Sequence, residues 1–263
     1  MQRRPSSHRR ARIYEGRAKI LFEGPEPGTL VQHFKDEGAG FDGTQEATIS
    51  GKGVLNNRIS EYLFSRLADI GVPNHFLRRV GLREQLVREV DMFPIELVVR
   101  NAAGGDFAKR FKMEPGTPLP RSIIEYYYKS ADLGTPMVSE EHITAFGWAM
   151  PPDLDDMVGL AVRVNDYLSG LFLGKGLRLI DFRLEFGRLW NEHGDVRILI
   201  ADEISPDNCR LWDMVGTDGR TPATAPLDIH KGGDAYREVA RRLGVLEEGE
   251  VIDLRDTRTS GTA

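Results

Sequence analysis

The chain of 263 residues has a single cysteine, Cys209, and no apolar run long enough to span a membrane. One thiol excludes an intrachain disulfide and fits a reducing compartment, and we interpret it as an inert, partly buried side chain. The basic segment from Met1 to Arg12 is not followed by the apolar core of a signal peptide. These absences predict a cytoplasmic protein that has no membrane partner.

Charge of one sign is not in large excess, because 35 Lys and Arg residues face 40 Asp and Glu residues. A protein with this balance lacks the broad basic surface that binds nucleic acid without regard to sequence. The six histidines are scattered without the spacing of zinc ligands. Any anionic ligand must therefore be held by a few local cations.

Short strands and few helices, without repeats or low-complexity linkers, predict an α+β fold. The expected strands cover residues 12–22, 30–35, 76–80, 86–90, 95–100, 123–129, 177–186 and 196–204. Apolar residues at helical spacing predict helices within 55–70, 154–171 and 235–243, each followed by a glycine that can end it. We expect two closely packed lobes, residues 11–93 and 94–253, between tails at 1–10 and 254–263 that fray.

The segment from Leu179 to Phe186 alternates between apolar and charged side chains, as a half-buried strand does. Asp181, Arg183 and Glu185 are expected on one face, opposite the four apolar side chains from Ile180 to Phe186. Alternation alone is equally compatible with an ordinary hairpin whose polar face is solvated.

The following residues, Asn191 to Gly194, have the composition of a turn. A loop of these residues would pair Trp190 with Asp195, and Asp202 would then join the charged face. Carboxylates of neighbouring strands can share a hard divalent cation, so Asp202 and the nearby glutamate at position 185 are candidate metal ligands. A slip of one residue in this register would turn Asp202 to the apolar side.

Other segments give weaker signals. Gly51-Lys52-Gly53 and Gly174-Lys175-Gly176 lack the remaining residues of the phosphate-binding motifs, so neither predicts nucleotide binding. Arg17 and Lys19 lie two apart and could face a polyphosphate, although a solvated strand face is the commoner origin of such a pair. Arg100 ends an apolar strand at a glycine-rich turn, where ligand binding and ordinary turn chemistry are equally natural.

Taken together, the motifs between about Tyr14 and Leu246 follow one another in a recognisable order. They are Tyr14-Glu15-Gly16-Arg17-Ala18-Lys19, Lys35-Asp36 with Phe41-Asp42-Gly43, Gly51-Lys52-Gly53-Val54-Leu55-Asn56-Asn57, Pro94-Ile95-Glu96 with Val98-Val99-Arg100-Asn101, Asp181-Phe182-Arg183-Leu184-Glu185-Phe186-Gly187, Ala201-Asp202-Glu203-Ile204-Ser205-Pro206-Asp207 and Arg210-Leu211-Trp212-Asp213. This series resembles the SAICAR synthetase family across nearly the whole chain.

The resemblance implies an ATP cleft between a small, mostly antiparallel N-terminal lobe that binds the nucleotide and a larger α+β lobe that holds substrate and metal. It also implies a purine-biosynthesis ligase that uses ATP and Mg²⁺. Such an enzyme converts the carboxylate of carboxyaminoimidazole ribonucleotide to an acyl phosphate, from which the amino group of aspartate displaces phosphate. The expected partners are these small molecules, with a homo-oligomer as a further possibility.

The resemblance also implies roles for particular residues. Those implied as catalytic are Lys19, Asp181 and Arg183; those at ATP are Arg17, Lys19, Val87 and Met92; those at the metal are Glu185 and Asp202; those at substrate are Asp42, Arg100, Asp106, Asp207 and Arg210.

The sequence departs from the family pattern on the substrate side. Ala102 replaces a second arginine, Asp106 replaces a serine, Arg183 replaces a lysine, and residues 228–234 shorten a basic stretch. An equally weighted alternative is therefore a paralogue repurposed in nucleoside antibiotic biosynthesis of the coformycin, pentostatin or formycin type. A third reading, a catalytically silent nucleotide-binding protein, is disfavoured by the two retained acidic metal candidates.

Overall fold

The computed structural model describes residues 10–37, 48–214, 233–247, 249 and 250. The predicted tails, apart from residue 10, lie outside the described residues. So do Asp42 and residues 228–232 of the shortened basic stretch. No helix within the described ranges is both long and apolar enough to cross a membrane.

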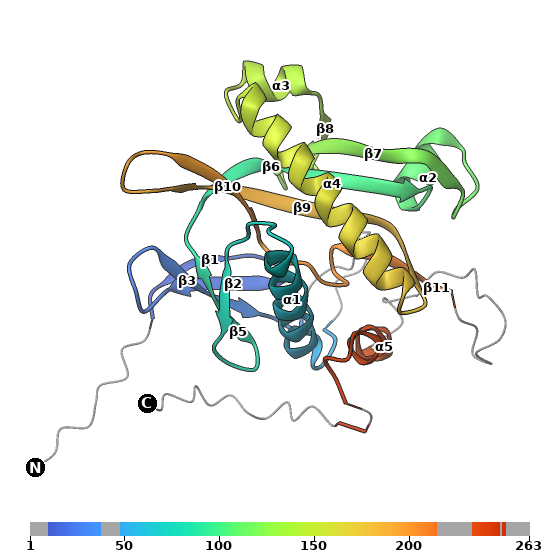
Figure 1. Cartoon of the computed structure of the whole chain (residues 1–263), viewed down its shortest axis with the longest axis horizontal. Helices are drawn as coiled ribbons and strands as arrows, with labels where there is room; N and C mark the ends of the chain where they lie inside the picture. The colour runs from blue at the N-terminus through green and yellow to red at the C-terminus, as the bar shows by residue number, and fades with distance from the viewer. Residues whose placement is uncertain (1–9, 38–47, 215–232, 248, 251–263) are drawn as a thin grey trace, which may run out of the picture.

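An antiparallel sheet, here called the N-terminal sheet, is built by the first strands of the described chain in the order β1-β2-β3-β5-β4. Its strands are β1 (Arg12–Glu15), β2 (Lys19–Glu23), β3 (Thr29–Phe34), β4 (Phe76–Arg79) and β5 (Glu84–Arg88). Helix α1 (Lys52–Asp69) packs against this sheet, and α5 (Gly233–Leu243) packs against α1. Figure 1 shows α1 against the N-terminal sheet and α5 next to α1.

A second sheet, the C-terminal sheet, follows the order β10-β9-β6-β7-β8, and β11 also pairs with β9. Its strands are β6 (Asp91–Ala102), β7 (Pro118–Tyr128), β8 (Met137–Val138), β9 (Leu177–Trp190), β10 (Val196–Ala201) and β11 (Cys209–Asp213). The long helix α4 (Pro151–Leu173) crosses this sheet and contacts β6, β9 and β10 (Figure 1). The short helices α2 (Gly105–Phe111) and α3 (Glu140–Ala145) lie near the ends of β6 and β7.

One apolar core joins the two sheets. The buried stripe of α1, represented by Leu63, and that of α4, represented by Leu168, belong to the same cluster as Phe182 of β9. Removing these side chains from water favours the packing of the two lobes against each other. Cys209 is also in this core and is 1 % exposed, so it is more deeply buried than the sequence suggested.

The predicted α+β class and two-lobed arrangement are confirmed, but several boundaries differ. The strand predicted over residues 12–22 is two strands, because the chain turns between Gly16 and Ala18. The lobe boundary expected between residues 93 and 94 stays a prediction, and it lies within β6, which begins at Asp91. The short elements α2, α3, β8 and β11 had not been predicted, since none has a long periodic pattern.

Candidate functional site

A pocket of about 470 Å³ lies between the two sheets, and we call it the intersheet pocket. The N-terminal sheet and the segments next to it contribute most of its wall, and four residues come from the C-terminal side. The lining side chains that the sequence had singled out are Arg17, Lys19, Val87, Met92, Glu185 and Asp202. The structure therefore brings together every residue expected at ATP and at the metal.

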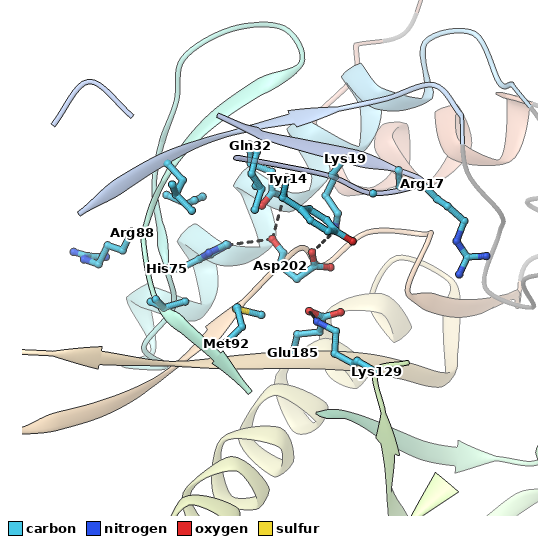
Figure 2. A pocket seen from close by; sticks show the side chains of 16 residues that line it. Tyr14, Arg17, Lys19, Gln32, His75, Arg88, Met92, Lys129, Glu185 and Asp202 are labelled. Carbon is cyan, nitrogen blue, oxygen red and sulfur yellow. Dashed lines mark hydrogen bonds and ion pairs between the residues drawn. The ribbon is translucent and has the colours of Figure 1, made fainter. Parts of the chain in front are cut away.

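Glu185 and Asp202 point toward one another across this pocket (Figure 2). Glu185 lies on β9, and Asp202 directly follows β10. Burial and the neighbouring Asp202 carboxylate raise the pKa of Glu185 to about 7, against the opposing effect of Lys129. Two carboxylates that disfavour each other's charge are a natural site for a cation.

Asp202 reaches this position by a route that the sequence did not predict. The loop between β9 and β10 runs from Asn191 to Asp195, and Trp190 pairs with Val196 rather than with Asp195. The predicted register was therefore wrong by one residue, which by alternation alone would turn Asp202 away from Glu185. Asp202 still faces the pocket because its backbone leaves the strand with φ 65°, in the left-handed region.

Lysines neutralise both carboxylates. Lys19 forms an ion pair with Asp202 and another with Glu203, at 2.9 Å, while Lys129 forms an ion pair with Glu185. Burial alone would lower the pKa of Lys19, but the three surrounding carboxylates raise it, so the ammonium stays charged. The pocket thus has closely spaced charges of both signs, an arrangement suited to a metal–polyphosphate ligand.

Arg17 and Lys19 were predicted to share a strand face, but they do not. Lys19 begins β2, whereas Arg17 lies in the turn before it, and Figure 2 shows its guanidinium pointing away from Lys19. Both still line the intersheet pocket. They consequently approach a ligand from different directions.

A second group of charged side chains, the Arg100 cluster, surrounds the end of β6. Arg100 is 2 % exposed, and its guanidinium donates to Asp181 at 2.7 Å, to Glu125 at 3.0 Å and to Asp106 at 3.4 Å. Arg210 of β11 donates to the other oxygen of Asp181 at 3.1 Å. These contacts fix the direction of both guanidinium groups. Asp106 differs from the other acids of the cluster because 63 % of its side chain is exposed to solvent.

The turn between β6 and α2 requires glycine because Arg210 lies against it. A Cβ atom on Gly105 would lie 2.4 Å from a guanidinium nitrogen of Arg210, and Gly105 also has φ 50°. A side chain at Gly104 would meet Ile180 at 2.8 Å. The glycines therefore allow the backbone to approach the Arg100 cluster closely.

Strand β9 connects the two groups. Asp181, Arg183 and Glu185 follow one face, with Arg183 bound to Glu96 at 3.1 Å, so about 13 Å of strand separates the first from the last. The predicted alternation fails at Ile180, which joins a separate cluster with Trp212 because the pairing of β11 with β9 shifts there. One strand face thus leads from the intersheet pocket to the Arg100 cluster.

Asp207, expected at substrate, is not brought into either group. Its carboxylate accepts hydrogen bonds from Lys52 and Asn56, each at 2.8 Å, and from the Tyr236 hydroxyl. Lys52 is 1 % exposed, so this site is closed. It joins α1 and α5 to the loop after β10.

Sequence reasoning missed several residues that line or support these sites. Lys129 pairs with Glu185, and the side chains of Gln32 and His75 contact the backbone of Asp202. Glu203 pairs with Lys19, and Glu125 orients Arg100. Each lies far along the chain from its partner or has no motif of its own. Only Glu203, next to Asp202 among the motif residues, carried a usable signal.

Solved structures of similar proteins share this architecture. A phosphoribosylaminoimidazole-succinocarboxamide synthase from Ehrlichia chaffeensis is 43 % identical, with a TM-score of 0.81 over 90 % of this chain and 100 % of that one. A SAICAR synthetase (Type-2) in complex with ADP is 36 % identical, with a TM-score of 0.79 over 90 % of this chain and 99 % of that one. Fold and site together define an enzyme of the ATP-dependent carbon–nitrogen ligase class.

Sequence comparison narrows the class to one family. A phosphoribosylaminoimidazole-succinocarboxamide synthase from Rhodospirillum centenum is 62 % identical over 94 % of this chain and 97 % of the relative. One from Acidiphilium cryptum is 57 % identical over 95 % and 98 %. The sequence model of SAICAR synthetase matches residues 12–232. The chain belongs to the SAICAR synthetase family.

Proposed function

We propose that this enzyme joins the carboxylate of carboxyaminoimidazole ribonucleotide to the amino group of aspartate, with conversion of ATP to ADP and phosphate, in purine biosynthesis. The observation that carries the proposal is the convergence of Glu185 and Asp202, each paired with a lysine, in the intersheet pocket. Relatives named phosphoribosylaminoimidazole-succinocarboxamide synthase match the chain over nearly its full length, which supports this activity for the chain.

The adenine of ATP would lie against the apolar part of this pocket, which includes Val87 and Met92. The phosphates would then extend toward Lys19 and Arg17. The substrate carboxylate attacks the terminal phosphorus, ADP leaves, and the amine of aspartate attacks the resulting acyl phosphate. Loss of a proton from nitrogen and departure of phosphate complete the amide.

The two carboxylates fit Mg²⁺. This ion binds through one or two carboxylates and the phosphates of its nucleotide, so the absence of a third acidic or histidine ligand among the described residues is no obstacle. When bound, Mg²⁺ supplies stabilisation of the charge that develops on the transferred phosphoryl group. Glu185 and Asp202 would hold this cation, and the ammonium groups of Lys129 and Lys19, no longer needed to neutralise those carboxylates, would be available to the phosphates.

The Arg100 cluster is our candidate for the anionic part of the imidazole substrate. Arg100 and Arg210 present guanidinium groups whose direction is fixed by Asp181, a fully buried carboxylate. We infer that Asp181 orients these arginines, and that Arg183, between the two groups on β9, stabilises charge on the carboxylate being activated. The roles expected for Asp42 and Asp207 stay predictions.

An assay of ADP release tests the proposed reaction. We expect turnover only when ATP, Mg²⁺, carboxyaminoimidazole ribonucleotide and aspartate are all present, because phosphoryl transfer and amine attack are consecutive steps on one substrate. Each component is omitted in turn as a control. Intact ATP binding without ADP release from the complete mixture contradicts the proposal.

The repurposed-paralogue alternative gains no support from the relatives described above, and the exposed position of Asp106 weakens the argument for it. An exposed charge interacts only modestly with its neighbours. Asp106→Ser is therefore expected to raise kcat/KM for the imidazole substrate by no more than about threefold. Asp156→Ser, at an exposed acid of α4, is the matched control, and either a larger rise or a fall in kcat/KM confined to Asp106→Ser would contradict this expectation.

Cytoplasmic location and assembly into a homo-oligomer remain proposals from the sequence. Size-exclusion chromatography with light scattering measures the oligomeric state directly.

A further inference from the structure

The backbone carbonyl of Asp202 receives two side-chain hydrogen bonds from the N-terminal part of the chain. Gln32 of β3 donates from Nε2 at 3.2 Å, and the His75 imidazole lies with its Nε2 at 3.1 Å. A carbonyl oxygen can only accept, so His75 carries its proton on Nε2. Figure 2 shows both contacts converging on Asp202, and the two side chains are only 2 % and 4 % exposed.

These contacts act on an unusual backbone position. Asp202 has φ 65°, a backbone conformation that residues other than glycine rarely adopt. The register of β10 would otherwise direct its carboxylate away from Glu185. The orientation of the Asp202 carbonyl is set by the backbone torsion of the same residue, so two donors on that oxygen hold the residue in its left-handed conformation.

His75 is itself held firmly between the two sheets. The backbone N–H of His75 donates to the carbonyl of Ile200 at 2.9 Å. The backbone carbonyl of His75 accepts from the N–H of Arg88 at 2.7 Å. The imidazole also packs edge-on to Phe64, with ring centroids 5.5 Å apart. Its donor direction is therefore fixed before any ligand binds, as expected of a preorganised support.

We propose that Gln32 and His75 are positioning residues that clamp the Asp202 carbonyl, so that the Asp202 carboxylate meets Glu185 in the geometry a divalent cation requires. This inference rests on the proposed metal site. The two residues act through Asp202. Positioning residues of this kind do not bind the metal ion themselves, but they affect the affinity of the site by orienting the side chains that do.

The chain offers a matched control for each substitution. Gln32→Met removes the donor at nearly constant volume, and Gln85→Met makes the same change at the residue directly opposite on β5, which is fully buried and whose amide has no hydrogen-bond partner in the described structure. His75→Phe keeps an aromatic ring. His33→Phe makes the same change at an imidazole of β3, which packs edge-on to Phe22 and lies 3.5 Å from the carboxylate of Glu84.

Binding of Mn²⁺ to the ADP-saturated enzyme, measured by electron paramagnetic resonance, tests the clamp without turnover. Gln32→Met and His75→Phe are each expected to weaken Mn²⁺ binding by about tenfold, because a released Asp202 relaxes from its left-handed conformation. The two control variants are expected to stay within about twofold of wild type. Test variants that bind Mn²⁺ as tightly as their controls overturn the clamp.

Two further measurements separate this outcome from failure of the metal site. His75→Gln retains an N–H donor at a similar distance from the backbone, so its affinity for Mn²⁺ is expected to return to within about threefold of wild type. This variant and Gln32→Met carry the test if His75→Phe does not fold. If wild type and Asp202→Asn bind Mn²⁺ equally, the proposed metal site is wrong, and the clamp, as a support for metal binding, is overturned with it.

Discussion

Asp202→Asn is expected to lower kcat by about 10³-fold or more while the fold is retained. Asparagine keeps the size of the side chain but removes the charge that binds a divalent cation and pairs with Lys19. The remaining carboxylate, Glu185, would then hold the cation alone. The measurement is steady-state ADP release with all substrates saturating, accompanied by circular dichroism to establish that the variant is folded.

The control for this variant is Asp153→Asn. Asp153 at the start of α4 forms an ion pair with Arg188 at 2.6 Å, with 19 % of its side chain exposed, compared with 27 % for Asp202. It lies outside the intersheet pocket, so losing this pair is expected to change kcat by no more than about twofold. Equal losses in the two variants would mean that the effect at Asp202 comes from the fold and not from the pocket.

The charged face of β9 could be predicted from the sequence because alternation is a local property. From Asp181 to Phe186 the strand has one face of charged side chains and one of apolar side chains, and the sequence shows which residues belong to each. Alternation places Glu185 on the charged face of β9, and the packing of the N-terminal sheet against that face makes the pocket. The same reasoning failed at Ile180, where the pairing with β11 shifts and the alternation is interrupted.

The position of Asp202 could not be predicted in the same way. Residues 198–201 of β10 are all buried, so their sequence does not alternate and carries no record of register. The loop accommodates one more residue than its composition suggested, and Asn191 uses its side chain to accept from the N–H groups of His193 and Asp195. The left-handed backbone conformation of Asp202 then turns its carboxylate toward Glu185, although the register of β10 alone would direct it away.

Partners contributed by distant segments are the other part that sequence reasoning missed. Lys129 meets Glu185 only because β7 and β9 both flank β6, and Lys129 directly follows β7. Gln32 and His75 reach Asp202 only because the two sheets pack together. A motif identifies acidic ligands within one segment, whereas the cations and donors that tune them depend on the completed fold.

The second large effect is expected from Asp181→Asn. Asp181 is fully buried, and its two oxygens accept from Arg100 and Arg210. Neutralising it leaves both guanidinium groups without their shared counter-ion, a change that is expected to destabilise the fold by about 3 kcal/mol. The corresponding fall in Tm is about 6 °C, measured by differential scanning calorimetry.

Catalysis should suffer in a specific way, which separates the arrangement of the arginines from general loss of stability. If Asp181 directs Arg100 and Arg210 toward the imidazole substrate, Asp181→Asn raises KM for that substrate by about tenfold and leaves KM for ATP nearly unchanged. Leu168→Ala is the comparison, because a cavity beneath α4 costs about 2 to 5 kcal/mol without touching either site. A similar rise in KM for the imidazole substrate in both variants would mean that Asp181 contributes to stability alone. A rise confined to Asp181→Asn places the anionic end of the substrate near Asp181, away from the ATP phosphates in the intersheet pocket.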